Sequence, residues 1–157
     1  MRTAAAALAG LALAAASVDD DLPAVLWHAP FLAGGGFCSE AHDMAHALAA
    51  VGVSVGAVHH GDSYNGDFVA GWPPAQQRAY AAWDAAARGM RPGSVVAVCH
   101  SEPGAWSVPR PNYQTAPCPP RGAAYAVGRA MFETDRLPDG WAKRLNAMDE
   151  VWVPTEW

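Results

Sequence analysis

The sequence predicts an α/β protein with a doubly wound, mainly parallel sheet. Short apolar runs that are typical of buried strands alternate along the chain with longer segments of helical periodicity. A glycine-rich turn, Gly34-Gly35-Gly36, separates the first apolar run from the first helical segment. Strands that alternate with helices in this way form parallel sheets, because each helix carries the chain back across the sheet.

Five segments are predicted to be strands, since each is a short apolar run bounded by glycine, proline or polar residues. They cover residues 24–29, 53–58, 95–99, 123–132 and 151–153. The first two strands, with the glycine turn and the helix between them, make a βαβ unit. Such a unit is right-handed and its strands are parallel.

Three segments are predicted to be helices: residues 38–50, a segment opened by Pro73-Pro74 and closed by Gly89, and residues 138–148. Apolar residues spaced by three and four define one face of each helix. These residues are Ala41, Met44, Ala45 and Leu48 in the first helix, Tyr80, Trp83 and Ala87 in the second, and Trp141, Leu145 and Met148 in the third. Gly52 is placed to cap the first helix. Residues 59–72 and 101–122 are predicted to be loops.

Length and charge narrow the classes of function. A chain of 157 residues is the size of one domain, and its net charge is -5. The ten Lys and Arg residues are scattered along the chain, without the basic cluster that grips a phosphate backbone. We therefore expect no nucleic-acid partner, and nothing in the pattern indicates membrane association.

Residues 1–17 are predicted to be a secretory signal peptide. Arg2 precedes an apolar run from Ala4 to Ala16, and Ala14 and Ala16 fit an A-x-A cleavage rule. This places the protein in the endoplasmic reticulum or Golgi lumen, or outside the cell. An organellar presequence and an alanine-rich start of a cytoplasmic protein are the alternatives. The folded domain is expected to cover residues 24–157.

The cysteines and histidines predict no metal site. Cys38, Cys99 and Cys118 make an odd count without a C-x-x-C pair, so neither zinc nor a disulfide framework is expected, and Cys99 is expected to be a buried small hydrophobe. His42 and His46 are spaced i, i+4, which suits a metal with His59, His60 or Asp62. A solvated helix face is the interpretation that the pattern favours.

Polar residues follow three of the predicted strands, and open α/β sheets bind ligands at the carboxyl ends of their strands. They are Gly34, Gly35 and Gly36 after the first strand, His100, Ser101 and Glu102 after the third, and Glu133 and Asp135 after the fourth. The His100 and Glu102 pair suits orientation of a hydroxyl or transfer of a proton. The carboxylates also suit glycoside hydrolysis. The simpler interpretations are a flexible glycine turn, a histidine that caps a loop, and a solvated glutamate.

Six of the seven tryptophans are candidates for the core or for sugar stacking. Trp27, Trp72, Trp83, Trp106, Trp141 and Trp152 are mostly expected in the core by their positions. Trp72 and Trp106 fall in predicted loops, where an indole can stack on a sugar ring.

Three motifs resemble one family. They are H-S-E-P-G-A-W at residues 100–106, M-F-E-T-D-R at 131–136 and M-D-E-V-W-V-P-T at 148–155. Together with the glycine turn, they resemble the N-terminal domain of GT-B retaining glycosyltransferases of family 4, also called group 1. The resemblance covers residues 24–157 and implies a Rossmann-like domain. It implies catalytic roles for Glu133 and His100, and substrate binding by Gly34, Gly35, Gly36, Ser101, Glu102 and Asp135. Many relatives have histidine near the position of Glu133.

The resemblance implies the acceptor-side half of an enzyme that transfers a sugar with retention. Its partners would be a nucleotide sugar and an acceptor, and no cofactor or metal would be needed. The donor-binding domain with its E-x7-E motif does not occur in these 157 residues, so we expect the chain alone to be inactive. Two alternatives remain open: a non-catalytic carbohydrate- or nucleotide-binding module of the same fold, and an unrelated α/β enzyme that uses Glu102, Glu133 and Asp135 as acids.

Overall fold

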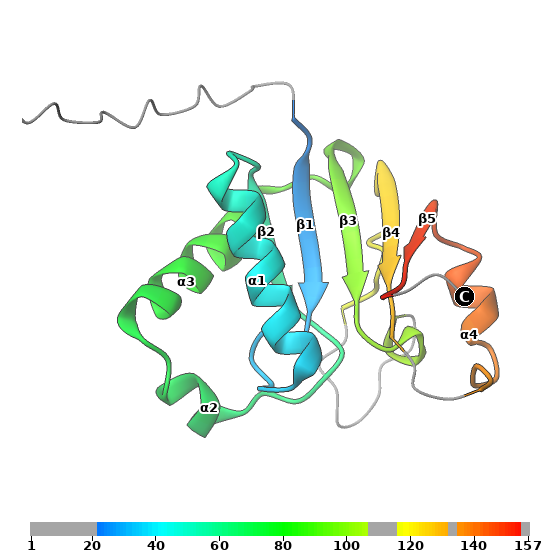
Figure 1. The fold of residues 1–157 in the computed structure, drawn as a ribbon. Helices are drawn as coiled ribbons and strands as arrows, with labels where there is room; N and C mark the ends of the chain where they lie inside the picture. The colour runs from blue at the N-terminus through cyan, green and yellow to red at the C-terminus, as the bar shows by residue number, and fades with distance from the viewer. Residues whose placement is uncertain (1–21, 107–115, 132–134, 155–157) are drawn as a thin grey trace, which may run out of the picture.

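The computed structural model describes residues 22–106, 116–131 and 135–154, and it confirms the predicted α/β class. A single sheet has the strand order β2-β1-β3-β4-β5, and every neighbouring pair of strands is parallel (Figure 1). The strands are β1 (Ala24–Ala29), β2 (Val55–His59), β3 (Val95–His100), β4 (Tyr125–Arg129) and β5 (Glu150–Trp152). Helices flank this sheet, as in Rossmann-like domains.

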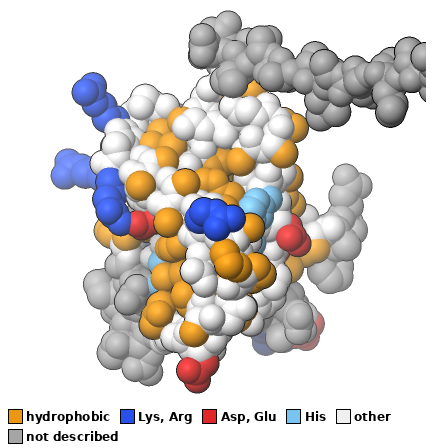
Figure 2. Space-filling view, turned by 90° about the vertical axis from the view of Figure 1, so that its left-hand side faces the viewer, with side chains coloured by type: hydrophobic (Ala, Val, Ile, Leu, Met, Phe, Trp, Pro, Cys, Tyr) orange, Lys and Arg blue, Asp and Glu red, His pale blue; other side chains and the backbone are white. Residues whose placement is uncertain are grey.

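The helices are α1 (Gly36–Ala50), α2 (Gly66–Ala70), α3 (Pro74–Gly89) and α4 (Trp141–Leu145), with 3-10 turns η1 (Pro92–Ser94) and η2 (Pro103–Ala105). In Figure 1, α1 lies in front of the β1 and β2 side of the sheet, and α4 lies at the opposite side near β5. The outer face of α3 is rich in exposed alanine, including Ala81, Ala82 and Ala85. Figure 2 views the molecule from the α3 side and shows apolar side chains between separate charged ones.

The two faces of the sheet bury different clusters. Trp27, Val98 and Val127 belong to a cluster that also contains Ala41 and Ala45 of α1. On the other face, Cys99, Trp106 and Ala130 pack with Leu145 and Met148 from the α4 region. Because side chains alternate between the faces of a strand, neighbouring Val98 and Cys99 enter different clusters. The chain is therefore doubly wound, as predicted.

Several expected boundaries differ from the structure. The expected loop over residues 59–72 contains α2, which starts because the Oδ1 of Asn65 accepts a hydrogen bond from the amide of Phe68. The third predicted helix is shorter than residues 138–148, because Gly140 takes a φ of 80° just before α4 begins. β4 is also shorter than the predicted strand at 123–132.

The face of α1 was predicted correctly except for Met44. Ala41 and Ala45 are fully buried, whereas Met44 is 42% exposed. The helical spacing placed Met44 at the margin of the buried face, where the sheet no longer covers it. Gly52 follows the end of α1 with a φ of 88°, which confirms its capping position.

One covalent link contradicts the sequence prediction. Cys99 and Cys118 form a disulfide across 19 positions of sequence, while Cys38 is a buried free thiol. The odd cysteine count and the lack of a motif concealed this pair, since only folding brings their Cα atoms to 5.7 Å.

The carboxyl ends of β1, β2 and β3 meet at one edge of the sheet. From β1 the chain moves to β2 on one side, and from β2 it crosses back over β1 to β3 on the other. The direction of winding thus reverses between β1 and β3. Such a reversal separates the two loops that follow these strands, and open α/β sheets bind ligands there.

None of the helices in the described ranges is long and apolar enough to cross a bilayer.

Candidate functional site

A small crevice opens where the winding of the sheet reverses. We call it the switch-point crevice; its volume is about 90 Å³. It is lined by Pro30, Gly35, Gly36, Phe37, Gly61, Asp62, Ser101 and Glu102. These residues follow β1, β2 and β3, so three loops and the start of α1 form its walls.

Four of the residues predicted from the sequence line this crevice: Gly35, Gly36, Ser101 and Glu102. Gly34 does not line it. An ideal Cβ on Gly34 would lie 3.0 Å from the ring of Phe68, and its φ is 85°, so this glycine makes the turn instead.

Of the two acids predicted in the fourth loop, the structure describes only Asp135. Asp135 is exposed and is absent from the crevice lining. Glu133 lies outside the described residues. Glu102, Glu133 and Asp135 were expected at the same edge of the sheet. The structure does not place Asp135 with Glu102 in the crevice, and the position of Glu133 stays a prediction.

The first turn of α1 presents its backbone to the crevice. Gly35 caps the helix without a side-chain hydrogen bond, and no acidic residue occupies the first turn. Gly35 and Gly36 are exposed, and no atom lies within 4 Å of an ideal Cβ on either. The first amide groups of a helix have no partner within it, and those of α1 begin at Gly36, which lines the crevice.

Ser101 forms the buried part of the crevice wall. Its Oγ accepts a hydrogen bond from the Nε1 of Trp106 at 3.2 Å and lies 3.3 Å from the Nδ1 of His60. An indole can only donate, so the hydroxyl proton of Ser101 is available to His60. Burial, and then the neighbouring His59, lower the pKa of His60 to about 4. This pair therefore consists of a serine hydroxyl and a neutral imidazole.

Gly61 is required beside this serine. Its φ is 90°, and an ideal Cβ would lie 2.6 Å from the Cβ of Ser101. A side chain at this position would push Ser101 out of place.

His100 lies behind the crevice and is fully buried. Its Nδ1 accepts a hydrogen bond from the Nε1 of Trp27 at 3.1 Å, and its Nε2 lies 3.0 Å from the Oε2 of Glu40. Because the indole must donate, Nδ1 carries no proton and Nε2 donates to Glu40. Burial lowers the pKa of His100 to about 4, despite the nearby Glu40 carboxylate. Both ring nitrogens are engaged, so the geometry favours a positioning role for His100.

Glu40 is a site residue that the sequence did not reveal. The Nη2 and Nε of Arg129 donate to its Oε1 at 2.6 and 3.2 Å. Burial raises the pKa of Glu40, but the hydrogen bond from Arg129 and the interactions with His100 outweigh it and lower the pKa below its usual range. Through these hydrogen bonds the Glu40 carboxylate links the first turns of α1 to the last residues of β3 and β4.

The core position expected for most of the tryptophans holds for Trp72 and Trp106, whereas the solvated position expected for His42 is wrong. Trp72 and Trp106 are 9% and 1% exposed, so neither presents an open indole face on which a sugar ring could stack. Both fall in irregular segments that fold back onto the core. His42 is buried too, not solvated, because its Nε2 lies 2.9 Å from the carbonyl oxygen of Phe31 and its ring packs edge-on against Trp72.

In the described part of the chain, no group of three or more His, Cys, Asp and Glu side chains could hold a metal ion. His46 lies on the exposed side of α1 and contacts Gln76.

Fold and crevice together define a Rossmann-like α/β protein with a crevice where the winding of its sheet reverses. The chain matches no family model, no curated protein and no solved structure.

Proposed function

We propose that this chain is the acceptor-binding domain of a retaining GT-B glycosyltransferase, and that the switch-point crevice receives hydroxyl groups of the acceptor. The observation that carries this proposal is the crevice itself. It combines the open amides of Gly35 and Gly36 with the carboxylates of Asp62 and Glu102 and the hydroxyl of Ser101. The motifs at residues 100–106, 131–136 and 148–155 support the family.

A hydroxyl-bearing ligand suits this mixture of donors and acceptors. A sugar hydroxyl donates to a carboxylate and accepts from an amide in the same site. A diphosphate would also gain from the start of α1, but Asp62 and Glu102 would repel it. The crevice is smaller than the roughly 300 Å³ or more of a pocket that encloses a drug-sized ligand, so it suits one edge of a sugar.

The Glu40, His100 and Arg129 group supports the site from behind. It ties α1 to the two strands whose ends form the carboxyl edge. We propose that this group keeps the amides of Gly35 and Gly36 at a fixed distance from Glu102. Fixed donors and acceptors lose little freedom when a ligand binds.

The donor nucleotide sugar would bind to a second domain in this class of enzyme. We therefore expect the 157-residue chain to bind glycans without transferring sugar. The Cys99 and Cys118 disulfide supports an oxidising compartment, which agrees with the proposed secretory location.

Binding of neutral glycans tests the crevice. Short neutral oligosaccharides and UDP are titrated separately into the ¹⁵N-labelled full chain, and amide shifts are followed. We expect a glycan to shift Gly35, Gly36 and Ser101, and Glu102→Gln to weaken its binding about tenfold, since about 1.4 kcal/mol corresponds to a factor of ten. Glu150→Gln on β5 is the matched control. Crevice shifts with UDP but with none of the glycans would contradict the proposal.

The glycosyltransferase class has its own test. The transcript is sequenced beyond the codon for Trp157. A continuous frame that encodes a second Rossmann-like domain with E-x7-E supports the class. A stop codon at that position, or sugar transfer by the purified 157-residue chain, would contradict the proposed half-enzyme.

A further inference from the structure

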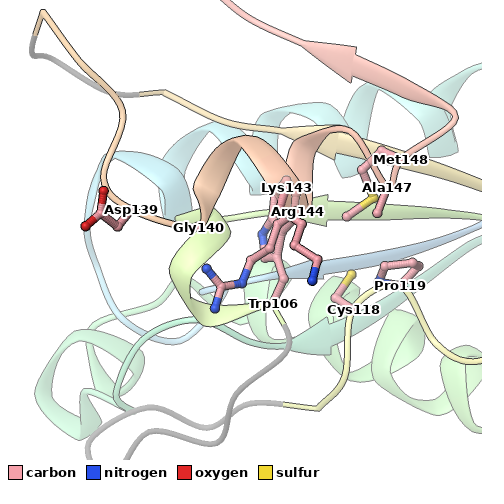
Figure 3. Close-up of a pocket in the computed structure, with 9 residues that line it drawn as sticks. All are labelled: Trp106, Cys118, Pro119, Asp139, Gly140, Lys143, Arg144, Ala147 and Met148. Carbon is pink, nitrogen blue, oxygen red and sulfur yellow. The ribbon is translucent and has the colours of Figure 1, made fainter.

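A second and larger cavity lies on the other face of the sheet, beneath α4. We call it the α4 pocket; its volume is about 410 Å³. It is lined by Trp106, Cys118, Pro119, Asp139, Gly140, Lys143, Arg144, Ala147 and Met148 (Figure 3). All of these residues belong to the described part of the chain. None of them lines the switch-point crevice.

The pocket has an apolar end. Figure 3 shows Cys118 and Pro119 on one segment, facing Ala147 and Met148 on the other, with Trp106 beside them. Trp106 and Cys118 are buried, and both belong to the cluster on this face. An apolar group placed here would lose contact with water and gain contact with an indole, a thioether and a proline ring.

The walls of this pocket are firmly held. The amide of Cys118 donates to the carbonyl oxygen of Trp106 at 2.8 Å, and the disulfide joins Cys118 to Cys99 of β3. The indole of Trp106 packs over Gly128, where an ideal Cβ would lie 2.7 Å from its ring. The cavity therefore exists before a ligand arrives, which lowers the cost of binding.

The charges are concentrated on α4. Lys143 and Arg144 are adjacent there and lie near Trp106 in Figure 3, whereas Asp139 lies apart from them. The lining thus carries two cationic side chains and one carboxylate. Lys143 is exposed and Arg144 is half-buried, so the Lys143 ammonium can reach a charged group at the pocket mouth, beside the Arg144 guanidinium, while the apolar part of the ligand lies inside.

We infer that the α4 pocket binds a small amphipathic anion, an apolar chain or ring that carries one phosphate or carboxylate. The apolar part lies against Trp106, Cys118, Pro119 and Met148. The anionic head lies between Lys143 and Arg144. Guanidinium and ammonium groups both bind phosphate and carboxylate oxygens through charge-assisted hydrogen bonds. No residue lines both this pocket and the switch-point crevice.

Three probes with the same eight-carbon chain test the inference: octyl phosphate, octanoate and 1-octanol. Each is titrated into the full chain by calorimetry, below the concentration at which it forms micelles. We expect octyl phosphate or octanoate to saturate one site, and octanol to bind at least about tenfold more weakly, a difference of about 1.4 kcal/mol. The stronger of the two anions identifies the head group.

Two variants and one control locate the site. Lys143→Gln with Arg144→Gln should weaken the anion about tenfold or more and leave octanol binding unchanged. Ala147→Trp should fill the apolar end and abolish binding of all three probes. The control, Arg78→Gln with Arg91→Gln, removes the same charge from exposed positions elsewhere. Thermal melts of each variant establish that it folds.

Several outcomes would overturn the inference. These are binding without saturation at one site, equal binding of octanol and the anions, an equal loss in the Arg78 and Arg91 control, or full binding by a folded Ala147→Trp variant. Because glycan shifts at Gly35 and Gly36 are measured separately, failure here would leave the proposed glycan site intact.

Discussion

The Nε1 of Trp106 donates a hydrogen bond to the Oγ of Ser101, and this bond joins the walls of two separate cavities. Ser101 lines the switch-point crevice, whereas Trp106 lines the α4 pocket. Since the indole occupies one lone pair of the hydroxyl, it also directs the hydroxyl proton toward His60. A movement of Trp106 would therefore change the hydrogen bonding of Ser101.

Ser101→Ala should destabilise the fold by about 1–3 kcal/mol. The substitution leaves the indole of Trp106 and the Nδ1 of His60 buried without partners. Urea denaturation measures the loss. Ser39→Ala is the control, because the Ser39 hydroxyl is exposed, and it should have little effect. Equal stability of the two variants would show that Ser101 does not hold this network.

Arg129→Met should lower the free energy of unfolding by about 3 kcal/mol or more, because it leaves the Glu40 carboxylate partly buried without its cation. Arg88→Met breaks the exposed pair with Asp84 on α3 and should cost less than about 1 kcal/mol. The same denaturation measurement compares the two. If Arg129→Met lowers stability as little as Arg88→Met does, the ion pair of Glu40 and Arg129 contributes little to the stability of the fold.

His100 should stay neutral at pH 5.5 with its proton on Nε2. The hydrogen bond that the Nε1 of Trp27 donates to the Nδ1 of His100 excludes a proton on this nitrogen. Burial lowers the pKa of His100 to about 4. The ¹⁵N shifts of the imidazole nitrogens distinguish the two tautomers and the cation. A proton on Nδ1 would rule out the Trp27 hydrogen bond.

Stability should fall as the pH is lowered from 6.5 toward 4.5. Burial lowers the pKa values of His28, His60 and His100 to about 4, against an ordinary value of about 6.5. In this window the unfolded chain binds more protons than the folded one. The stability present above pH 6.5 is therefore lost as the pH falls, by up to about 1.4 kcal/mol per pH unit for each group.

Urea denaturation at several pH values measures this slope. His28→Leu should flatten this slope, because the variant removes a titrating group whose Nδ1 has no hydrogen-bond partner among the described residues. Glutamate and aspartate contribute mainly below about pH 4.5, so the upper window isolates the histidines. A stability that is constant from pH 6.5 to 4.5 would contradict the burial of these rings.

One thiol should react with Ellman's reagent in the denatured, unreduced chain, and three after reduction. Cys38 is the free thiol, and Cys99 and Cys118 are paired. Cys118→Ala should reduce stability by about 3 kcal/mol, the value expected for a loop of this length. Three reactive thiols before reduction would exclude the disulfide.

The sequence predicted the sheet well, since buried strands and the turns around them leave local signals. It also placed Gly35, Gly36, Ser101 and Glu102 after parallel strands, at the edge where such sheets bind ligands, and the structure brings these four residues into one crevice.

The ion pair of Glu40 and Arg129, which supports the crevice, leaves no local signal in the sequence. Glu40 and Arg129 are 89 positions apart, and no spacing rule relates a residue on α1 to the last residue of β4. The disulfide was missed for the same reason. Sugar stacking by Trp72 and Trp106 stayed open in the sequence because irregular segments can be as deeply buried as helices, and periodicity does not report this.

The strand order has a consequence for how this domain could change during evolution. Every residue that lines the switch-point crevice lies between Pro30 and Glu102. The later elements β4, α4 and β5 reach it only indirectly, above all through Arg129. The part of the chain after Trp106 can therefore diverge, and acquire a ligand of its own, with few constraints from the crevice. Retention of an arginine at the end of β4 is the main exception.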